Sequence, residues 1–271
     1  MKRSFFAGPY VIWMVVFTLM PLLFVVYYAF TDSSGALSLA NWMDYFTPGN
    51  LRTLWASIRL ALECTAICLA VGYPAAMFLA SRDLSRNKTL FVLILLPMWM
   101  NFLLRTYAMR ELLRSGGVLS AVFAFFGVEM PQLLYTEGAV LLGRVYNYLP
   151  FMILPIYTCL KKLDQRVVEA AEDLGANPMQ VVLRVNMPLS LPGVVSGITM
   201  VFMPAVTTFA ISKLLGGGMT FLVGDQIENL FITLSNWNNG STISLILLVL
   251  IIASLALLRK VDPDNKGGGL W

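Results

Sequence analysis

Residues 161–192 read KKLDQRVVEAAEDLGANPMQVVLRVNMPLSLP, a charged segment with helical spacing between two long apolar runs. Asp164 is placed to cap the start of a short helix, and Gly175 to end it in a left-handed conformation. Asn177 followed by Pro178 then provides the start of a second helix. A plain connecting loop would need neither this length nor caps at both joints. The segment therefore predicts a helix, a turn and a second helix that together form a docking surface for a partner.

The composition on either side of this segment is that of a membrane protein. Hydrophobic residues make up 58% of the chain and charged residues 13%, whereas soluble domains average about 45–50% and about 25%. Runs of about 20 apolar residues are long enough to cross a hydrocarbon core of roughly 30 Å as helices. We expect an all-α membrane protein with one transmembrane domain, residues 1–261, and six spans at about 5–30, 56–81, 89–112, 138–160, 188–212 and 239–259.

Three further segments are assigned from their length and composition. Residues 161–187 form the polar loop, and the short polar tail 262–271 is expected to be flexible. The apolar run 116–128 is too short to span and predicts a re-entrant or interfacial helix. The first run is interpreted as a retained anchor, because its apolar region is too long for a secretory signal and no small-residue cleavage site follows.

Basic residues set the expected orientation. Most of the 19 lysines and arginines fall near the N-terminus, in residues 82–88, in the loop 161–187 and near the C-terminus. The positive-inside rule then places both termini and the loop in the cytoplasm. The net charge of +4 follows from this topology and gives no reason to expect nucleic acid as a partner.

The sequence also argues against several kinds of chemistry. Histidine is absent, so an intramembrane serine protease of the rhomboid kind would have no catalytic base. There is no P-loop pattern, and therefore ATP hydrolysis would be the work of another subunit. Three cysteines without a metal-binding spacing are interpreted as small buried residues. We expect no catalytic residues, no metal and no cofactor.

The loop resembles a known signature. Glu169-Ala170-Ala171, with Gly175 and the later Met187-Pro188, is similar to the EAA motif of ABC-importer permeases, whose fold is a MetI-like bundle of membrane helices. In that family the loop forms the coupling helix that sits in a cleft of the ATPase subunit. The resemblance implies an anchoring acid at Glu169, a close-contact face at Ala170 and Ala171, and a turn at Gly175. The expected coupling set is completed by Asp173.

A second resemblance concerns the cargo. Residues 97–113, 145–164 and 203–231 are similar to permeases of spermidine/putrescine importers. That family implies a bacterial inner-membrane heterodimer with a second permease, two ATPase subunits, an extracytoplasmic substrate-binding protein and surrounding membrane lipid. Importers of sulfate, ferric iron or thiamine share the loop, so another small solute stays an alternative. A stand-alone transporter or channel would predict inverted repeats or a proton relay, and neither is present; a membrane scaffold is the remaining alternative.

Charged residues inside the spans indicate a candidate substrate path. Each costs roughly 2.5–3.5 kcal/mol on insertion scales and so requires a partner or a wet cavity. Aromatic faces and a carboxylate near them would suit a flexible organic dication. The candidate path consists of Glu63, Trp99, Asn101, Arg105, Tyr107, Tyr146 and Asn147. The alternative is structural: Glu63 would pair with Arg105 or Arg144 between helices, and the tyrosines would belong to the interfacial belt.

The outer loop after the fifth span adds Lys213, Asp225 and Glu228 as candidates. Acids and bases on the outer side nearly balance, so charge alone does not decide the cargo. Where the polyamine family carries an acid after the fifth span this chain has Lys213, which weakens a simple acidic funnel. Small residues, among them Gly72 in the second span and Gly193 and Gly197 in the fifth, predict seams of close helix packing.

Overall fold

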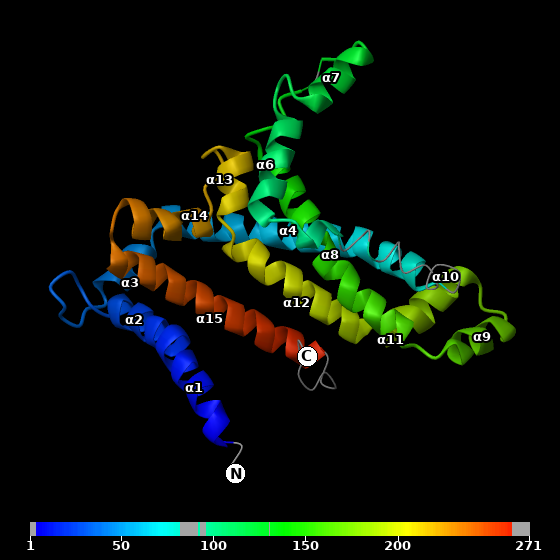
Figure 1. Cartoon of the computed structure of the whole chain (residues 1–271), viewed down its shortest axis with the longest axis horizontal. Helices are drawn as coiled ribbons and strands as arrows, with labels where there is room; N and C mark the ends of the chain where they lie inside the picture. The colour runs from blue at the N-terminus through cyan, green and yellow to red at the C-terminus, as the bar shows by residue number, and fades with distance from the viewer. Residues whose placement is uncertain (1–3, 82–91, 93–95, 130, 262–271) are drawn as a thin grey trace.

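The described part of the chain is a bundle of helices. The computed structural model describes residues 4–81, 92, 96–129 and 131–261, coloured in Figure 1. Within these ranges the only strand-like feature is one isolated bridge between Thr31 and Leu37. The predicted all-α class is therefore confirmed.

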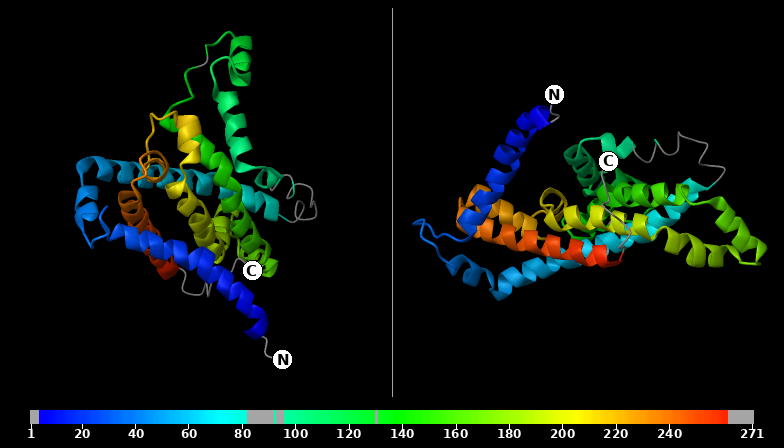
Figure 2. Two further views of the ribbon diagram at one scale, coloured as in Figure 1. Left: turned by 60° about the vertical axis from the view of Figure 1, so that its left-hand side comes forward. Right: turned by 90° about the horizontal axis from the view of Figure 1, so that it is seen from below.

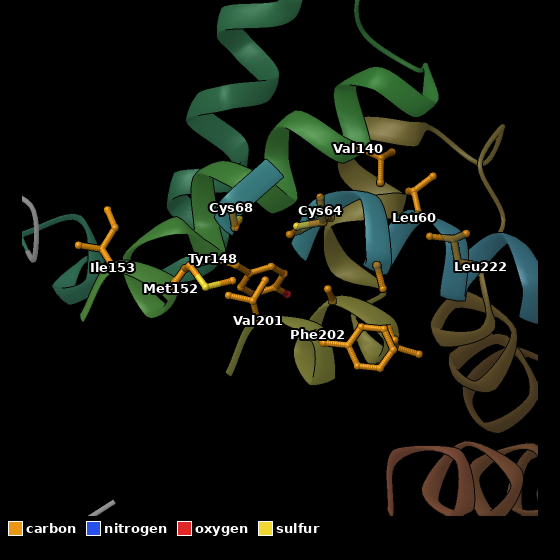
Figure 3. Close-up of a cluster of buried hydrophobic side chains, with 14 of the residues drawn as sticks. Leu60, Cys64, Cys68, Val140, Tyr148, Met152, Ile153, Val201, Phe202 and Leu222 are labelled. Atoms are coloured by element: carbon orange, nitrogen blue, oxygen red, sulfur yellow. The ribbon is translucent and has the colours of Figure 1, made fainter. Parts of the chain in front are cut away.

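Three helices form the core. They are α4 (Pro48–Ala80), α8 (Glu137–Lys161) and α12 (Leu191–Thr207), which pack against one another. Figure 3 shows their apolar side chains meeting, with Cys64 from α4, Met152 from α8 and Val201 from α12. All three of these side chains are fully buried. The interpretation of Cys64 as a small buried residue is confirmed.

Glycines allow this close packing. A Cβ atom at Gly72 would lie 3.0 Å from Met152 Cγ, and one at Gly197 would lie 2.7 Å from the sulfur of the same methionine. A Cβ atom at Gly193 would lie 2.8 Å from the Pro155 carbonyl oxygen. Because α4 and α12 approach α8 through residues without side chains, the predicted small-residue seams are confirmed.

The N-terminal membrane helix lies at the edge of the bundle. It consists of α1 (Ser4–Met14), a π-helical segment (Val15–Leu19) and α2 (Met20–Ala29). Helix α2 packs against α15 (Trp237–Val261), whereas α1 extends away from the other helices (Figure 1). The apolar side chains of this helix are therefore open to lipid or to another subunit.

The shorter helices occupy the ends of the bundle. Helices α3 (Ala40–Tyr45) and α14 (Val223–Glu228) lie at one end, and α9 (Gln165–Asp173) and α10 (Pro178–Val181) at the other (Figure 1). Figure 2 shows from two further directions that these ends are well separated. The remaining elements are α6 (Phe102–Leu113), α7 (Val118–Phe125), α11 (Met187–Leu189), α13 (Ala210–Gly216) and π-helical segments at Val182–Asn186 and Asn229–Thr233.

Four of the predicted spans correspond to single helical stretches that are long and apolar enough to cross a membrane. These are Pro9–Ala29, Pro48–Ala80, Glu137–Lys161 and Trp237–Leu258. The predicted span 188–212 differs, because the chain bends by 69° between Pro178–Leu189 and Leu191–Thr207. A membrane crossing there would be a bent pair rather than one straight helix.

The predicted span 89–112 falls partly outside the described residues. Its described part is interrupted at Asn101, whose side-chain oxygen accepts the backbone N–H groups of Leu103 and Leu104 and so starts α6. With 12 residues, α6 is about 18 Å long, short of a bilayer core of roughly 30 Å. The total of six spans stays a prediction, as does the flexibility of the tail, which also lies outside the described residues.

Candidate functional site

The loop between α8 and α12 is built by local hydrogen bonds. Asp164 Oδ1 accepts the Arg166 N–H at 3.0 Å and starts α9. Gly175 has φ of 85°, a left-handed conformation that glycine adopts at little cost. Asn177 and Gln180 form a reciprocal capping box, with distances of 2.8 and 2.9 Å. The predicted helix, turn and second helix are confirmed.

The residues of the EAA motif are accessible. Glu169, Ala170, Asp173 and Gly175 are exposed, and Ala171 is partly buried. A Cβ atom placed on Gly175 would meet no atom of the described residues within 4 Å. The apolar side chain of Leu174 beside it is 89% exposed. The loop therefore presents a surface of small, acidic and apolar side chains that a partner subunit can approach closely.

A pocket of about 440 Å³ separates α9 from the membrane helices. Glu169 and Glu172 line it from α9, Met77 and Ala80 from the end of α4, and Leu160 from the end of α8. Helix α9 is thus only loosely packed on the bundle, and the firm attachment of this segment lies farther along the chain.

That attachment is the bend before α12. Helix α10 runs through the π-helical segment and α11 to Ser190, where the direction changes by 69°. The Ser190 side chain is fully buried and lies 3.0 Å from the hydroxyl of Tyr73 on α4. Because the Ser190 hydroxyl donates to the Met187 carbonyl oxygen, the Tyr73 hydroxyl is left to donate to Ser190. The end of the loop is therefore joined to α4 at the point where α12 begins.

The candidate substrate path divides into exposed and buried residues. Trp99 is 80% exposed, Tyr107 47% and Tyr146 42%. Asn101 is exposed as well, but its side chain caps α6. These side chains are open to an adjoining subunit, lipid or cargo. Glu63 instead forms an ion pair on its own helix, and Arg105 and Asn147 are buried.

Glu63 does not pair with a buried arginine. Its carboxylate lies 3.5 Å from Arg59 Nε on the same helix, and Arg59 also binds Glu137 of α8 at 2.5 Å. The structural alternative that paired Glu63 with Arg105 or Arg144 is therefore wrong. The i,i+4 spacing of Arg59 and Glu63 in the sequence could have predicted this ion pair.

Two buried arginines lie near the core. Arg144 is fully buried, and all three of its guanidinium nitrogens lack a hydrogen-bond partner in the described part of the chain. Arg105 is 6% exposed, with two of its nitrogens unpartnered there. Asn147, three residues after Arg144 on α8, is also buried, and its Nδ2 donates to the Gly143 carbonyl oxygen at 2.8 Å. Arg105 and Asn147 are thus buried within the described part of this subunit, and their place in a substrate path stays a prediction.

Asp225 supplies a negative charge for this interior. It is 3% exposed, accepts hydrogen bonds from Ser212 Oγ at 2.8 Å and from the Leu222 N–H at 3.0 Å, and lies within electrostatic range of Arg144. Burial raises the pKa of the Asp225 carboxyl, while the two hydrogen bonds act in the opposite direction. The sequence identified Asp225 as an outer-loop candidate, but did not reveal that it folds back towards a buried arginine.

Lys213 and Glu228 neutralise each other. Their charged atoms are 2.6 Å apart, with the lysine side chain 51% and the glutamate 14% exposed. Lys213, the basic residue where the polyamine family carries an acid, therefore has its own counter-charge in Glu228.

Comparison with known proteins identifies the fold and the family. The sequence profile described as "Binding-protein-dependent transport system inner membrane component" matches residues 72–266. The chain belongs to this family of inner-membrane permeases. The matched region contains the core helices α8 and α12, the loop 161–187 between them and the bend at Ser190.

Individual relatives resemble this permease over nearly its whole length. The spermidine/putrescine transport system permease protein PotB of Haemophilus influenzae is 38% identical over 93% of this chain and 94% of its own. PotB of Escherichia coli is 34% identical over 93% of this chain and 98% of its own.

Solved structures support the fold. A bacterial ABC transporter involved in the import of the acidic polysaccharide alginate has a chain with a TM-score of 0.74 and 15% identity, covering 94% of this permease and 93% of that chain. A chain of the MetNI methionine ABC transporter gives a TM-score of 0.57 and 19% identity, covering 78% of this permease and 95% of that chain. The MetI-like class of fold is therefore confirmed.

Proposed function

We propose that this permease is a transmembrane subunit of an ATP-driven importer for polyamines such as spermidine and putrescine. The observation that carries the proposal is the 34–38% identity to two spermidine/putrescine permeases over 93% of the chain. The exposed aromatic residues Trp99 and Tyr107 support the same class of cargo, since aromatic faces attract organic cations.

The family supports a larger assembly around this permease. A second permease would pair with this one, and together they would enclose the path, with Tyr146 and Glu63 available at exposed positions of α8 and α4. Two ATPase subunits would bind at the loops, and a substrate-binding protein would deliver cargo on the other side. Both termini would be cytoplasmic, as the positive-inside rule predicts.

Coupling would proceed through the loop. An ATPase surface that holds Glu169, Ala170, Ala171 and Asp173 would displace α9 when nucleotide binds or leaves. Because α9 is loosely packed on the bundle while Ser190 is buried against Tyr73, the displacement would be delivered to α12 and α4. Those helices form the core, so their movement would open or close the path on the outer side.

The test is reconstitution of the complex. The chain is expressed with its neighbouring permease and ATPase genes, purified and placed in liposomes with the binding protein. We expect polyamine uptake that requires ATP, together with ATP hydrolysis stimulated by polyamine-loaded binding protein. Uptake of sulfate, ferric iron or thiamine in place of polyamine would reject the cargo and retain the family; purification without an ATPase would reject the importer.

A further inference from the structure

One charged side chain is enclosed on the side of the core away from the loop 161–187. Arg144 lies in the first half of α8 and is fully buried, and none of its guanidinium nitrogens has a hydrogen-bond partner in the described part of the chain. Arginine stays charged in proteins and carries five N–H donors. These nitrogens are closed off from solvent, so neither water nor an ion reaches them in this conformation.

Two helices close against α8 beside this side chain. A Cβ atom at Gly143, the residue before Arg144, would lie 3.1 Å from Ile211 Cγ2 of α13. On the side of α4, Cys68 Sγ lies 3.9 Å from the Val145 carbonyl oxygen. Figure 3 shows Cys64 and Cys68 of α4 beside the ribbon of α8. We call this arrangement of α4, α8 and α13 around Arg144 the closed packing.

The acids of this region do not neutralise Arg144 directly. Three of them already pair with Arg59 or Lys213, namely Glu63, Glu137 and Glu228. Asp225 attracts Arg144 from a distance, but the two make no ion pair. The carboxylate oxygens of Asp225 instead accept Ser212 Oγ and the Leu222 N–H. The acid is thus held on its own segment and leaves the guanidinium unpaired.

A polar neighbour on the same face of α8 is also incompletely bonded. Asn147 follows Arg144 by three residues, and its Oδ1 is buried without a hydrogen-bond donor among the described residues. Side chains three positions apart on a helix are neighbours. A donor and an acceptor therefore lie on one face without bonding, so the packing around them, rather than a lack of acceptors, keeps Arg144 unsatisfied.

An unpaired charge in a closed interior is unfavourable, because the charge has lost its water and gained no partner in return. A movement that parts the helices admits water to the guanidinium and removes this penalty. We propose that Arg144 is a conformational device: its unpaired charge destabilises the closed packing and favours an arrangement in which α4 and α13 lie farther from α8. The identity of this movement as a step of transport rests on the proposed function, whereas the destabilising effect of the charge rests on the packing alone.

The test measures how often the closed packing opens. Cys64 is fully buried on α4 and lies within electrostatic range of Arg144, so an opening that admits water to the guanidinium also makes this thiol reachable. The complex in lipid nanodiscs is treated with iodoacetamide, with and without ATP and vanadate, and modification of Cys64 is followed by mass spectrometry. Because a guanidinium also favours the reactive thiolate, rates are measured over a range of pH and compared per thiolate.

We expect Arg144→Gln to slow the modification of Cys64 by roughly tenfold or more, since removal of the unpaired charge makes the closed packing more populated. This direction is diagnostic. A substitution that merely damages a buried site loosens the packing and would make the thiol more reactive.

Three further variants separate the charge from the packing. Arg144→Lys keeps the positive charge and should retain most of the wild-type rate. Val140→Ala, one turn earlier on α8 and also fully buried, removes packing without removing charge and should raise the rate. Arg114→Gln removes an exposed arginine that pairs with Glu111 and should leave the rate unchanged.

The outcomes separate this device from the transport function. A rate in Arg144→Gln equal to or above that of the wild type would overturn the device even if the complex imports polyamines. The same conclusion would follow if Arg144→Gln failed to assemble while Val140→Ala assembled, because Arg144 would then hold the fold together. A slower rate in Arg144→Gln, in a complex that imports another solute or whose rates ignore nucleotide, would retain the device and reject the cargo or the ATP-driven cycle respectively.

Discussion

The two ends of the bundle are held together in different ways. At the docking loop the decisive hydrogen bonds join residues two or three positions apart, such as Asn177 with Gln180. At the opposite end they join distant segments: Gln226 binds Asn50, and the Val223 N–H donates to Ser57 Oγ across 166 positions. The shape of the loop is therefore fixed by its own local hydrogen bonds, whereas the shape of the opposite end depends on how the helices are packed.

The shape of the loop can therefore be predicted from local sequence patterns, whereas the contacts at the opposite end are revealed only by the structure. A change in the loop should affect coupling and leave the outer lining intact. A change at the outer end should affect cargo and leave the ATPase contact intact. The following predictions test that separation in order of decreasing effect.

Charge reversal at the loop should have the largest effect. Glu169→Lys is expected to abolish uptake while the chain still inserts, because an exposed acid in a docking helix is matched by basic residues of its partner and reversal brings like charges together. Uptake, assembly and stimulated ATP hydrolysis are measured in the same membranes.

The matched control for this change is Glu172→Lys, an equal charge change at another exposed position of α9. We expect it to retain a larger share of uptake. Equal loss in both variants would assign the effect to the total charge of the loop, and normal import by Glu169→Lys would reject the coupling role.

The turn of the loop should be next in sensitivity. Gly175→Val places a β-branched residue at φ of 85°, where even simpler side chains cost about 1–2 kcal/mol. No atom of the described residues lies within 4 Å of a Cβ at that position, so the loss of stimulated ATPase activity should come from backbone strain and from the partner's surface.

Gly175→Asn serves as the comparison, because asparagine tolerates the left-handed conformation. We expect Gly175→Asn to keep most of the activity that Gly175→Val loses. If both variants assemble and respond to substrate normally, neither the turn nor the close approach matters for coupling.

The aromatic residues should show a moderate effect on cargo alone. Trp99→Ala or Tyr107→Ala is expected to lower polyamine uptake several-fold, since a cation–π contact contributes about 0.5–1 kcal/mol when exposed and about 2 kcal/mol when desolvated. Assembly and basal ATP hydrolysis should not change. Phe125→Ala on α7, where the side chain is 85% exposed, is the control; a loss of uptake in that variant equal to the others would count against a specific path.

The Lys213–Glu228 pair should give the smallest effect. Because the lysine is paired at 2.6 Å, Lys213→Gln is expected to change polyamine uptake less than twofold and to alter stability by at most about 1 kcal/mol, as for other partly exposed ion pairs. The double variant with Glu228→Gln should resemble the single one. A several-fold rise in uptake would instead mean that Lys213 repels cargo despite its partner.

Much of the architecture was predictable from local patterns. Long apolar runs predicted four spans that the structure contains as single stretches, and glycine spacing predicted where α4 and α12 approach α8. The cap residues Asp164, Gly175 and Asn177 predicted the loop because each acts within a few residues. The break at Asn101 was missed, although asparagine is a favoured N-cap, because an uninterrupted apolar run outweighed it.

The sequence by itself determined the class, four of the spans and the shape of the loop 161–187, since hydropathy and capping are properties of short segments. Only the tertiary structure decided that Arg144 is buried, that Asp225 folds back to Ser212, and that Glu63 pairs within its own helix. It also brought Asp44 and Gln226 to one pocket. Such contacts depend on the rotation and depth of each helix against its neighbours, which side-chain packing across the whole bundle sets and no local pattern encodes.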